Sequence, residues 1–128
     1  MNTLIICLVV VALLPYLAKT PVVMSLVKLP EGYDNHYQRL QQSKLQGFGA
    51  RAVAAHQNAF EALIVFSSAV LLAIATHHTS SMMQVLAVTY VASRLVYHAA
   101  YLLDLASLRS IVWLMGLVIA LSMMLFCL

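Results

Sequence analysis

Four long apolar stretches alternate with short polar segments along this chain, covering about residues 3–27, 45–75, 82–103 and 108–126. An α-helix rises 1.5 Å per residue, so each stretch is about long enough to cross the roughly 30 Å hydrocarbon layer of a bilayer. We therefore predict an all-α integral membrane protein. Its four transmembrane helices form one bundle, and residues 1–128 make a single membrane domain.

The first apolar stretch is expected to remain in place as a membrane span. It lacks the basic start and the small-x-small cleavage site of a secretory signal. Pro15 and Pro21 fall inside it and could kink it, because a proline removes a backbone hydrogen bond from a helix. Residues 29–44 form the only extended polar segment and are interpreted as a loop, with Tyr33 and Tyr37 suited to the membrane–water interface.

Composition supports the same class of protein. The chain is 63% hydrophobic and 9% charged, whereas an ordinary soluble domain has about 25% charged residues. A soluble fold of this size could not bury so much apolar surface. The net charge of +3 comes from dispersed basic residues, so no nucleic-acid partner is expected. Cys7 and Cys127 lie near opposite ends of the chain and predict no metal site.

The basic residues also predict an orientation in the membrane. Lys28, Arg39, Lys44 and Arg51 gather around the first connection, and Arg109 lies at the third. The second connection and both termini have no Lys or Arg. The positive-inside rule then places the first and third connections in the cytoplasm, with both termini outside.

A polar stripe marks the second apolar stretch. Arg51, Asn58 and Glu61 are spaced i, i+7 and i+10, which places them on one side of a helix that turns about 100° per residue. Ionisable side chains inside a membrane span are costly and need partners, so they are a functional-site hypothesis by default.

The third apolar stretch carries a second stripe, Arg94, Tyr97, His98 and Tyr101, at i, i+3, i+4 and i+7. A tight connection makes the second and third helices antiparallel neighbours. We therefore expect Arg94 to lie at a depth similar to that of Glu61, where the two side chains can form an ion pair.

The other polar residues are expected to line a mouth that opens to the cytoplasm: Arg51, Tyr97, Tyr101 and Arg109. Such a cation-rich pocket suits a small anion with carboxylates and amides, because arginine binds carboxylates through two parallel hydrogen bonds. A thiol ligand would gain further, since a free thiol has a pKa near 8.5 and a neighbouring cation stabilises the thiolate.

Structural roles are the alternative for the same residues. An ion pair between Glu61 and Arg94 could merely lock two helices together, and Asn58 could make an interhelical hydrogen bond. His56 and His98 are interpreted as packing or hydrogen-bonded core residues. His56 and Glu61 do not share a helix face, which argues against a metal site.

Both stripes resemble motifs of the MAPEG family, the membrane-associated proteins in eicosanoid and glutathione metabolism. The segment ARAVAAHQNAFEALIVF is similar to the family's second-helix pattern E-R-x-x-R-A-x-x-N-x-x-E-x-x-x-x-F. The segment RLVYHAAYLLDLASLRS is similar to its third-helix pattern R-x-x-Y-x-x-x-Y, followed by an arginine near the start of helix four. The matched positions are Arg51, Ala55, Asn58, Glu61 and Phe66 in the first motif and Arg94, Tyr97, Tyr101 and Arg109 in the second.

The resemblance implies a homotrimer that binds glutathione between neighbouring subunits, in a U-shaped pose facing the cytoplasm. The positions implied to bind or brace glutathione are Arg51, Asn58, Glu61, Arg94, Tyr97 and Tyr101, with Arg109 as the catalytic residue that stabilises the thiolate. A small apolar electrophile, such as a lipid hydroperoxide or a halogenated aromatic, would arrive from the membrane lipids.

The chain departs from the family pattern at a few positions. Ala54 stands where eicosanoid-forming members have a second arginine that grips glutathione, and Ala50 replaces the preceding acidic residue. Ala62 stands where some members have a tyrosine or threonine. This pattern resembles the prokaryotic branch, which implies a bacterial inner membrane.

Two functions remain open from the sequence. The first is a membrane glutathione transferase or peroxidase acting on apolar electrophiles. The second is a non-enzymatic protein on the same scaffold that binds a lipid or a small anion. A transporter is not favoured, because the chain shows no inverted repeat and no pair of broken helices.

Overall fold

The computed structural model describes all residues from 1 to 128 and contains five helices: α1 (Asn2–Val27), α2 (Gln38–Lys44), α3 (Phe48–Ala75), α4 (Ser81–Leu102) and α5 (Ala106–Leu125). Four of them, α1, α3, α4 and α5, are long and apolar enough to cross a membrane. The predicted all-helical architecture with four membrane spans is therefore confirmed. α1 runs unbroken through both Pro15 and Pro21.

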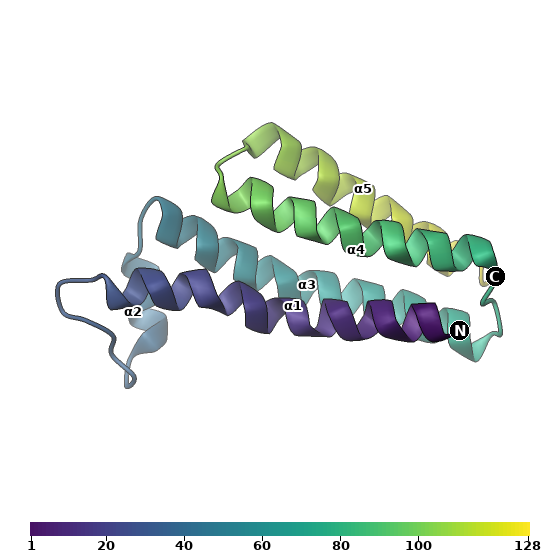
Figure 1. Cartoon of the computed structure of the whole chain (residues 1–128), viewed down its shortest axis with the longest axis horizontal. Helices are drawn as coiled ribbons and strands as arrows, with labels where there is room; N and C mark the ends of the chain where they lie inside the picture. Colours follow the sequence, from purple (N-terminus) through teal and green to yellow (C-terminus); the bar gives the residue numbers. More distant parts are fainter.

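The four long helices run up and down, with α1 against α3 and α4 against α5 (Figure 1). The two pairs are joined by α3, which contacts both α4 and α5, and by α1, which contacts α4 but not α5. Both termini and the α3–α4 connection lie at one end of the bundle, the terminal end (Figure 1). The α1–α3 segment with α2, and the α4–α5 connection, lie at the other end, the loop end.

The polar segment after α1 differs from its prediction as a plain loop, because Gln38–Lys44 forms the short helix α2. Gln41 organises this segment from a buried position. Its Nε2 donates a hydrogen bond to the Gly32 carbonyl at 2.8 Å, and its Oε1 accepts one from the Asp34 backbone at 2.8 Å. α3 then starts at Phe48 rather than near residue 45, after Gly47 adopts a positive φ of 54°.

Two tight connections bring consecutive helices side by side, and each ends a helix with a residue in the left-handed region. His77 (φ 60°) follows α3, and Asp104 (φ 62°) follows α4. In each case the N–H of the next residue donates a hydrogen bond to a carbonyl inside the helix. His78 donates to Ala73 at 2.9 Å, and Leu105 donates to Ala100 at 2.8 Å. Glycine usually occupies such positions, because a side chain there costs about 1 kcal/mol.

The buried core is concentrated toward the terminal end. A cluster of 15 buried residues includes Leu4, Phe66 and Met123, whereas the second cluster, near the loop end, contains only Val22, Leu26 and Ala52. Many large apolar side chains point outward from the spanning helices, as is typical of helices that face lipid. The loop half of the bundle therefore has less apolar packing to hold it together.

Candidate functional site

Arg94 is the most deeply buried charge in the chain. It lies on α4 with 3% of its surface exposed. Its Nη2 donates hydrogen bonds to the α5 carbonyls of Val112 at 2.8 Å and Trp113 at 3.5 Å, and its Nε lies 3.4 Å from Ser93 Oγ. No carboxylate of the chain pairs with it, and its Nη1 makes no hydrogen bond within the chain. Because only neutral groups bind this buried cation, its positive charge is not neutralised within the chain and can attract an anion.

Gly116 makes room for this guanidinium. A Cβ at position 116 would clash with Nη2 of Arg94 and would lie 2.7 Å from its Cζ. In an α-helix, the carbonyl of Val112 already accepts the N–H of residue 116. The missing side chain lets Arg94 reach the same carbonyl from outside α5. Gly116 therefore positions Arg94, a role that nothing in the sequence pattern had indicated.

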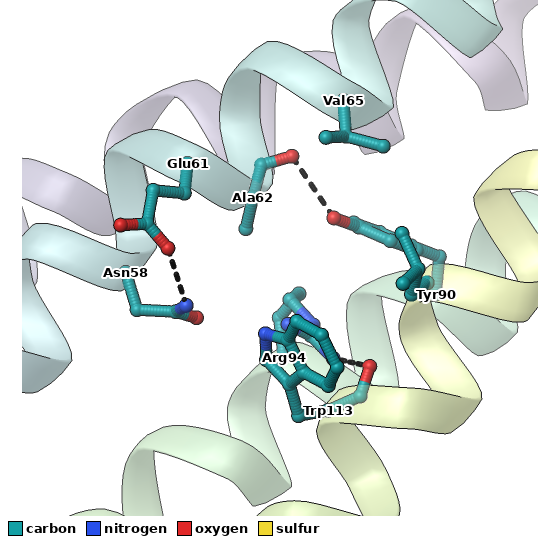
Figure 2. A pocket seen from close by; sticks show the side chains of 8 residues that line it. Asn58, Glu61, Ala62, Val65, Tyr90, Arg94 and Trp113 are labelled. Atoms are coloured by element: carbon teal, nitrogen blue, oxygen red, sulfur yellow. Dashed lines mark hydrogen bonds between the residues drawn. The ribbon is translucent and has the colours of Figure 1, made fainter.

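A pocket of about 170 Å³, here called the Arg94 pocket, opens between α3, α4 and α5 (Figure 2). Its lining residues are Asn58, Glu61, Ala62, Val65, Tyr90, Arg94, Trp113 and Leu117. Figure 2 shows Asn58 and Glu61 at one side of this opening, on α3, and Arg94 with Trp113 at the other. The pocket thus separates a carboxylate from a buried guanidinium.

The ion pair that the sequence allowed between Glu61 and Arg94 does not form within this chain. Glu61 is exposed, and its Oε2 accepts a hydrogen bond from Asn58 Nδ2 at 2.9 Å. The carbonyls of α5 hold Arg94 instead, because Gly116 allows the guanidinium to lie against that helix. Each charge is left facing the pocket without the other as its partner.

Tyr90 belongs to the site but was missed in the sequence. Its hydroxyl donates a hydrogen bond to the Ala62 carbonyl at 2.9 Å, which ties α4 to α3. Its ring stacks on Phe66 with centroids 4.3 Å apart, and Arg94 Cζ lies 5.2 Å from its centroid. The available signal was its position four residues before Arg94, which extends the α4 stripe by one turn.

A ladder of arginine and tyrosine side chains leads from this pocket toward the loop end. Arg94 Cζ lies 5.1 Å from the Tyr97 ring, and Tyr97 meets Tyr101 edge-to-face with centroids 5.5 Å apart. Arg109, at the start of α5, then stacks on Tyr101 at 4.6 Å. The structure thus brings together Arg94, Tyr97, Tyr101 and Arg109. Neither tyrosine hydroxyl of this ladder makes a hydrogen bond within the chain.

Arg51 lies apart from the Arg94 pocket and binds a residue that the sequence did not single out. Its Nη1 lies 3.4 Å from Asp104 Oδ2, the only ion pair in the chain, which links α3 to the α4–α5 connection. The Arg51 Nε is buried and has no hydrogen-bond partner, and the same is true of Asn58 Oδ1. Buried polar atoms usually have a hydrogen-bond partner, so both atoms remain available for a hydrogen bond to another molecule.

The two histidines expected to be core residues bind backbone groups. His56 Nδ1 lies 2.9 Å from the Pro15 carbonyl, which joins α3 to α1, and His98 Nδ1 lies 2.8 Å from the Arg94 carbonyl. The His98 Nε2 is buried without a partner.

Another pocket, of about 530 Å³, lies among α1, α2 and α3 and is here called the Lys19 pocket. Its lining residues are Lys19, Gln38, Arg39, Gln42, Ser43, Val53, His56, Gln57 and Phe60. Neither Lys19 nor Arg39 forms an ion pair, and no carboxylate lines the pocket. It is therefore a second surface that can receive an anion.

Comparison with known proteins identifies the family of this chain. The family model described as the MAPEG family matches residues 3–128, which is nearly the whole chain. Searches of curated proteins and of solved structures gave no match. The chain has four helices that can span a membrane, and Asn58, Glu61 and Arg94 lie around one pocket. It belongs to the MAPEG family.

Proposed function

We propose that this protein is a membrane glutathione transferase or peroxidase, in which a glutathione thiolate attacks an apolar electrophile. The observation that carries the proposal is Arg94, a buried cation without a carboxylate partner, facing Glu61 and Asn58 across a pocket. Glutathione has two carboxylates, one amino group and two amides. A guanidinium, a carboxylate and an amide side chain complement those groups.

Arg109 is proposed as the residue that stabilises the thiolate. It lies at the far end of the tyrosine ladder, stacked on Tyr101 near the loop end. Lowering a thiol pKa by about two units requires roughly 2.7 kcal/mol of preferential interaction with the thiolate. In the transferase reaction the sulfur–carbon bond forms as the leaving group departs with its electron pair. In the peroxidase reaction, two thiols reduce a hydroperoxide to an alcohol and water and become a disulfide.

A single chain supplies only part of such a site. The Arg94 pocket has about 170 Å³, whereas small-molecule pockets occupy about 300–1,000 Å³. We propose a homotrimer in which the Lys19 pocket of one subunit faces the Arg94 pocket of the next. Lys19 and Arg39 would then bind carboxylates of glutathione, while Glu61 and Asn58 bind its amino and amide groups.

The charge pattern supports an orientation for this site. The acidic and basic side chains lie toward the loop end or in its connections, with the exception of Glu61 and Arg94. The connection at the terminal end carries no Asp, Glu, Lys or Arg. We propose that the loop end faces the cytoplasm of a bacterial cell, with the protein in the inner membrane. Glutathione then enters from the cytoplasm, and the electrophile from the lipid.

Calorimetric titration of glutathione into the purified protein tests the proposal, together with turnover of a generic aryl halide. We expect saturable heat and turnover in the wild-type protein. Arg109→Ala should keep most of the heat but lower kcat by about 100-fold, the effect of removing one group that stabilises developing charge. Absence of both heat and turnover in the wild-type protein would refute the proposal.

Shared sites can be tested by mixing two inactive variants. Glu61→Gln damages the Arg94 pocket, and the double variant Lys19→Gln/Arg39→Gln damages the Lys19 pocket. If each site combines one pocket from each of two subunits, random mixed trimers recover about one quarter of the wild-type sites, because only one orientation of each mixed interface is intact. No recovery in co-expressed, doubly tagged trimers would contradict the shared site.

A second candidate function is binding of a lipid or small anion between subunits without catalysis. Ala54 favours it, because this half-buried alanine lines neither the Arg94 pocket nor the Lys19 pocket and supplies no charge to either. Native mass spectrometry distinguishes the two functions. A tightly held phospholipid that glutathione does not displace supports the second, and displacement by glutathione supports the first.

A further inference from the structure

A third pocket, of about 560 Å³, lies at the loop end where α1 ends and α3 begins, and is here called the Lys28 pocket. It shares no lining residue with the Arg94 pocket or the Lys19 pocket. Its lining residues are Met24, Ser25, Lys28, Leu29, Lys44, Leu45, Gln46, Phe48 and Gly49. Its volume is within the range of small-molecule sites.

The charge of this pocket is purely positive. Lys28 follows the last residue of α1, and Lys44 is the last residue of α2. Both are exposed, and neither forms an ion pair or a side-chain hydrogen bond within the chain. No carboxylate lines the pocket. The helix ends favour a cation at these positions. Lys44 also borders a neighbouring pocket that Glu31 and Asp34 line, but neither carboxylate forms an ion pair with it.

The remaining walls are apolar and partly open. Met24 is 56% exposed and Phe48 is 45% exposed, while Leu29 and Leu45 lie half-buried beside them. Gly49 allows α1 and α3 to approach closely at this point, since a Cβ there would lie 3.1 Å from Ser25 Cβ and Leu45 Cβ. A small ion from solution would leave this apolar surface uncovered, whereas a molecule with both a charged headgroup and hydrocarbon chains would cover it.

The position in the bundle matches the level of lipid headgroups. The lining residues of the pocket come from the end of α1, the end of α2 and the start of α3, and α1 and α3 are both long and apolar enough to span a membrane. Tyr37 and Leu40, at the start of α2, are 67% and 58% exposed. Exposed aromatic and apolar side chains next to lysines are typical of a segment that rests in the membrane interface.

We propose that the Lys28 pocket binds one anionic phospholipid, with its phosphate between Lys28 and Lys44 and its acyl chains along Met24 and Phe48. The net charge of the lipid matters because the pocket has no carboxylate to receive the ammonium group of a zwitterionic headgroup. Basic residues at a membrane surface attract anionic lipids with about 1 kcal/mol each. This proposal concerns a site outside the proposed glutathione site and does not depend on it.

Native mass spectrometry of the full chain, equilibrated with equal amounts of phosphatidylglycerol and phosphatidylcholine of the same acyl chains, tests the proposal. We expect the wild-type protein to retain the anionic lipid preferentially. The double variant Lys28→Gln/Lys44→Gln should lower that preference by about 30-fold, the factor that corresponds to two lysines. Lys28→Arg/Lys44→Arg, which keeps both charges, should retain it.

A matched control separates the pocket from overall charge. Ala106→Asp/Ser107→Asp changes the net charge by the same amount at the same end of the bundle, on exposed residues that line none of the three pockets, and it should change the lipid preference far less. An equal loss in this control would overturn the proposal, as would an unchanged preference in Lys28→Gln/Lys44→Gln. Displacement of the lipid by inorganic phosphate in excess would also count against a phospholipid as the occupant, whereas retention of the lipid supports it.

Discussion

In the terminal half of the bundle, 15 buried residues pack into one apolar cluster, whereas in the loop half the corresponding cluster has three. The loop half instead contains Arg94, the tyrosine ladder and the Arg51–Asp104 ion pair. The three buried side-chain atoms without a hydrogen-bond partner, in Arg51, Asn58 and His98, all lie in this half. The terminal half thus contains no buried side-chain nitrogen or oxygen without a hydrogen-bond partner, whereas the loop half contains three.

The difference shows that one helix, α3, contributes both to the apolar core and to the candidate site. α3 runs through both halves, with Phe66, Ala69 and Ala73 packed in the terminal half and Asn58 and Glu61 beside the Arg94 pocket in the loop half. Stability is therefore expected to depend mostly on the terminal half, and ligand binding on the loop half. The following substitutions test that division.

The largest loss of stability is expected for Phe66→Ala. The ring is fully buried and stacks on Tyr90 at 4.3 Å, so its removal leaves a cavity and should lower the free energy of unfolding by about 3 kcal/mol. Denaturant titration in detergent, followed by circular dichroism, measures this loss. Ile64→Ala is the control on the same helix, since Ile64 is 67% exposed, and similar losses for both would contradict a core centred on Phe66.

A smaller loss is expected for Gly116→Ala, together with a loss of ligand binding. The added methyl group displaces Arg94 from the Val112 carbonyl, which should cost about 2 kcal/mol in stability and abolish the heat of glutathione titration. Arg94→Met in the same chain should recover the stability but not the heat, because a buried charge can be replaced by an apolar side chain without loss of stability.

Gly49→Ala is the matched control for that substitution. Its Cβ would meet only carbon atoms, at 3.1 Å and beyond, and no charged side chain. We expect it to leave the glutathione heat unchanged. If Gly116→Ala bound glutathione as well as Gly49→Ala does, Arg94 would have no part in binding.

The smallest effects are expected at the two left-handed helix ends. His77→Gly relieves the strain at φ 60° and should raise stability by about 0.5–1 kcal/mol. Asp104→Gly relieves the same strain but also removes the partly exposed ion pair with Arg51, so its gain should be smaller by up to about 1 kcal/mol. Thermal unfolding of both variants measures the difference, and equal gains would show that the ion pair contributes nothing.

Sequence reasoning succeeded where periodicity alone decides the outcome. The four spans follow from apolar length and helix geometry, and the structure reproduces them. It failed where the choice of partner depends on another helix. Depth along the bundle allowed Glu61 to meet Arg94, but Gly116, 22 positions further along the chain, lets the guanidinium bond to α5 instead.

Smaller errors have the same origin. The polar segment after α1 looked like a loop because its residues favour turns, yet one buried glutamine, Gln41, bonds back to Gly32 and Asp34 and supports a helical turn. Tyr90 was not singled out in the sequence, although its hydroxyl donates a hydrogen bond to the Ala62 carbonyl 28 positions away. Contacts between residues far apart in the chain leave no periodic trace.

The sequence by itself determined that this is a four-span helical membrane protein, because apolar length and the spacing of polar residues act locally through the geometry of the α-helix. Only the tertiary structure decided which groups satisfy one another. Arg94 bonds to backbone carbonyls of α5, Glu61 to Asn58, and Arg51 to Asp104. The physical reason is that a side chain's partner depends on which helices approach closely, and here a single missing Cβ at Gly116 made that choice.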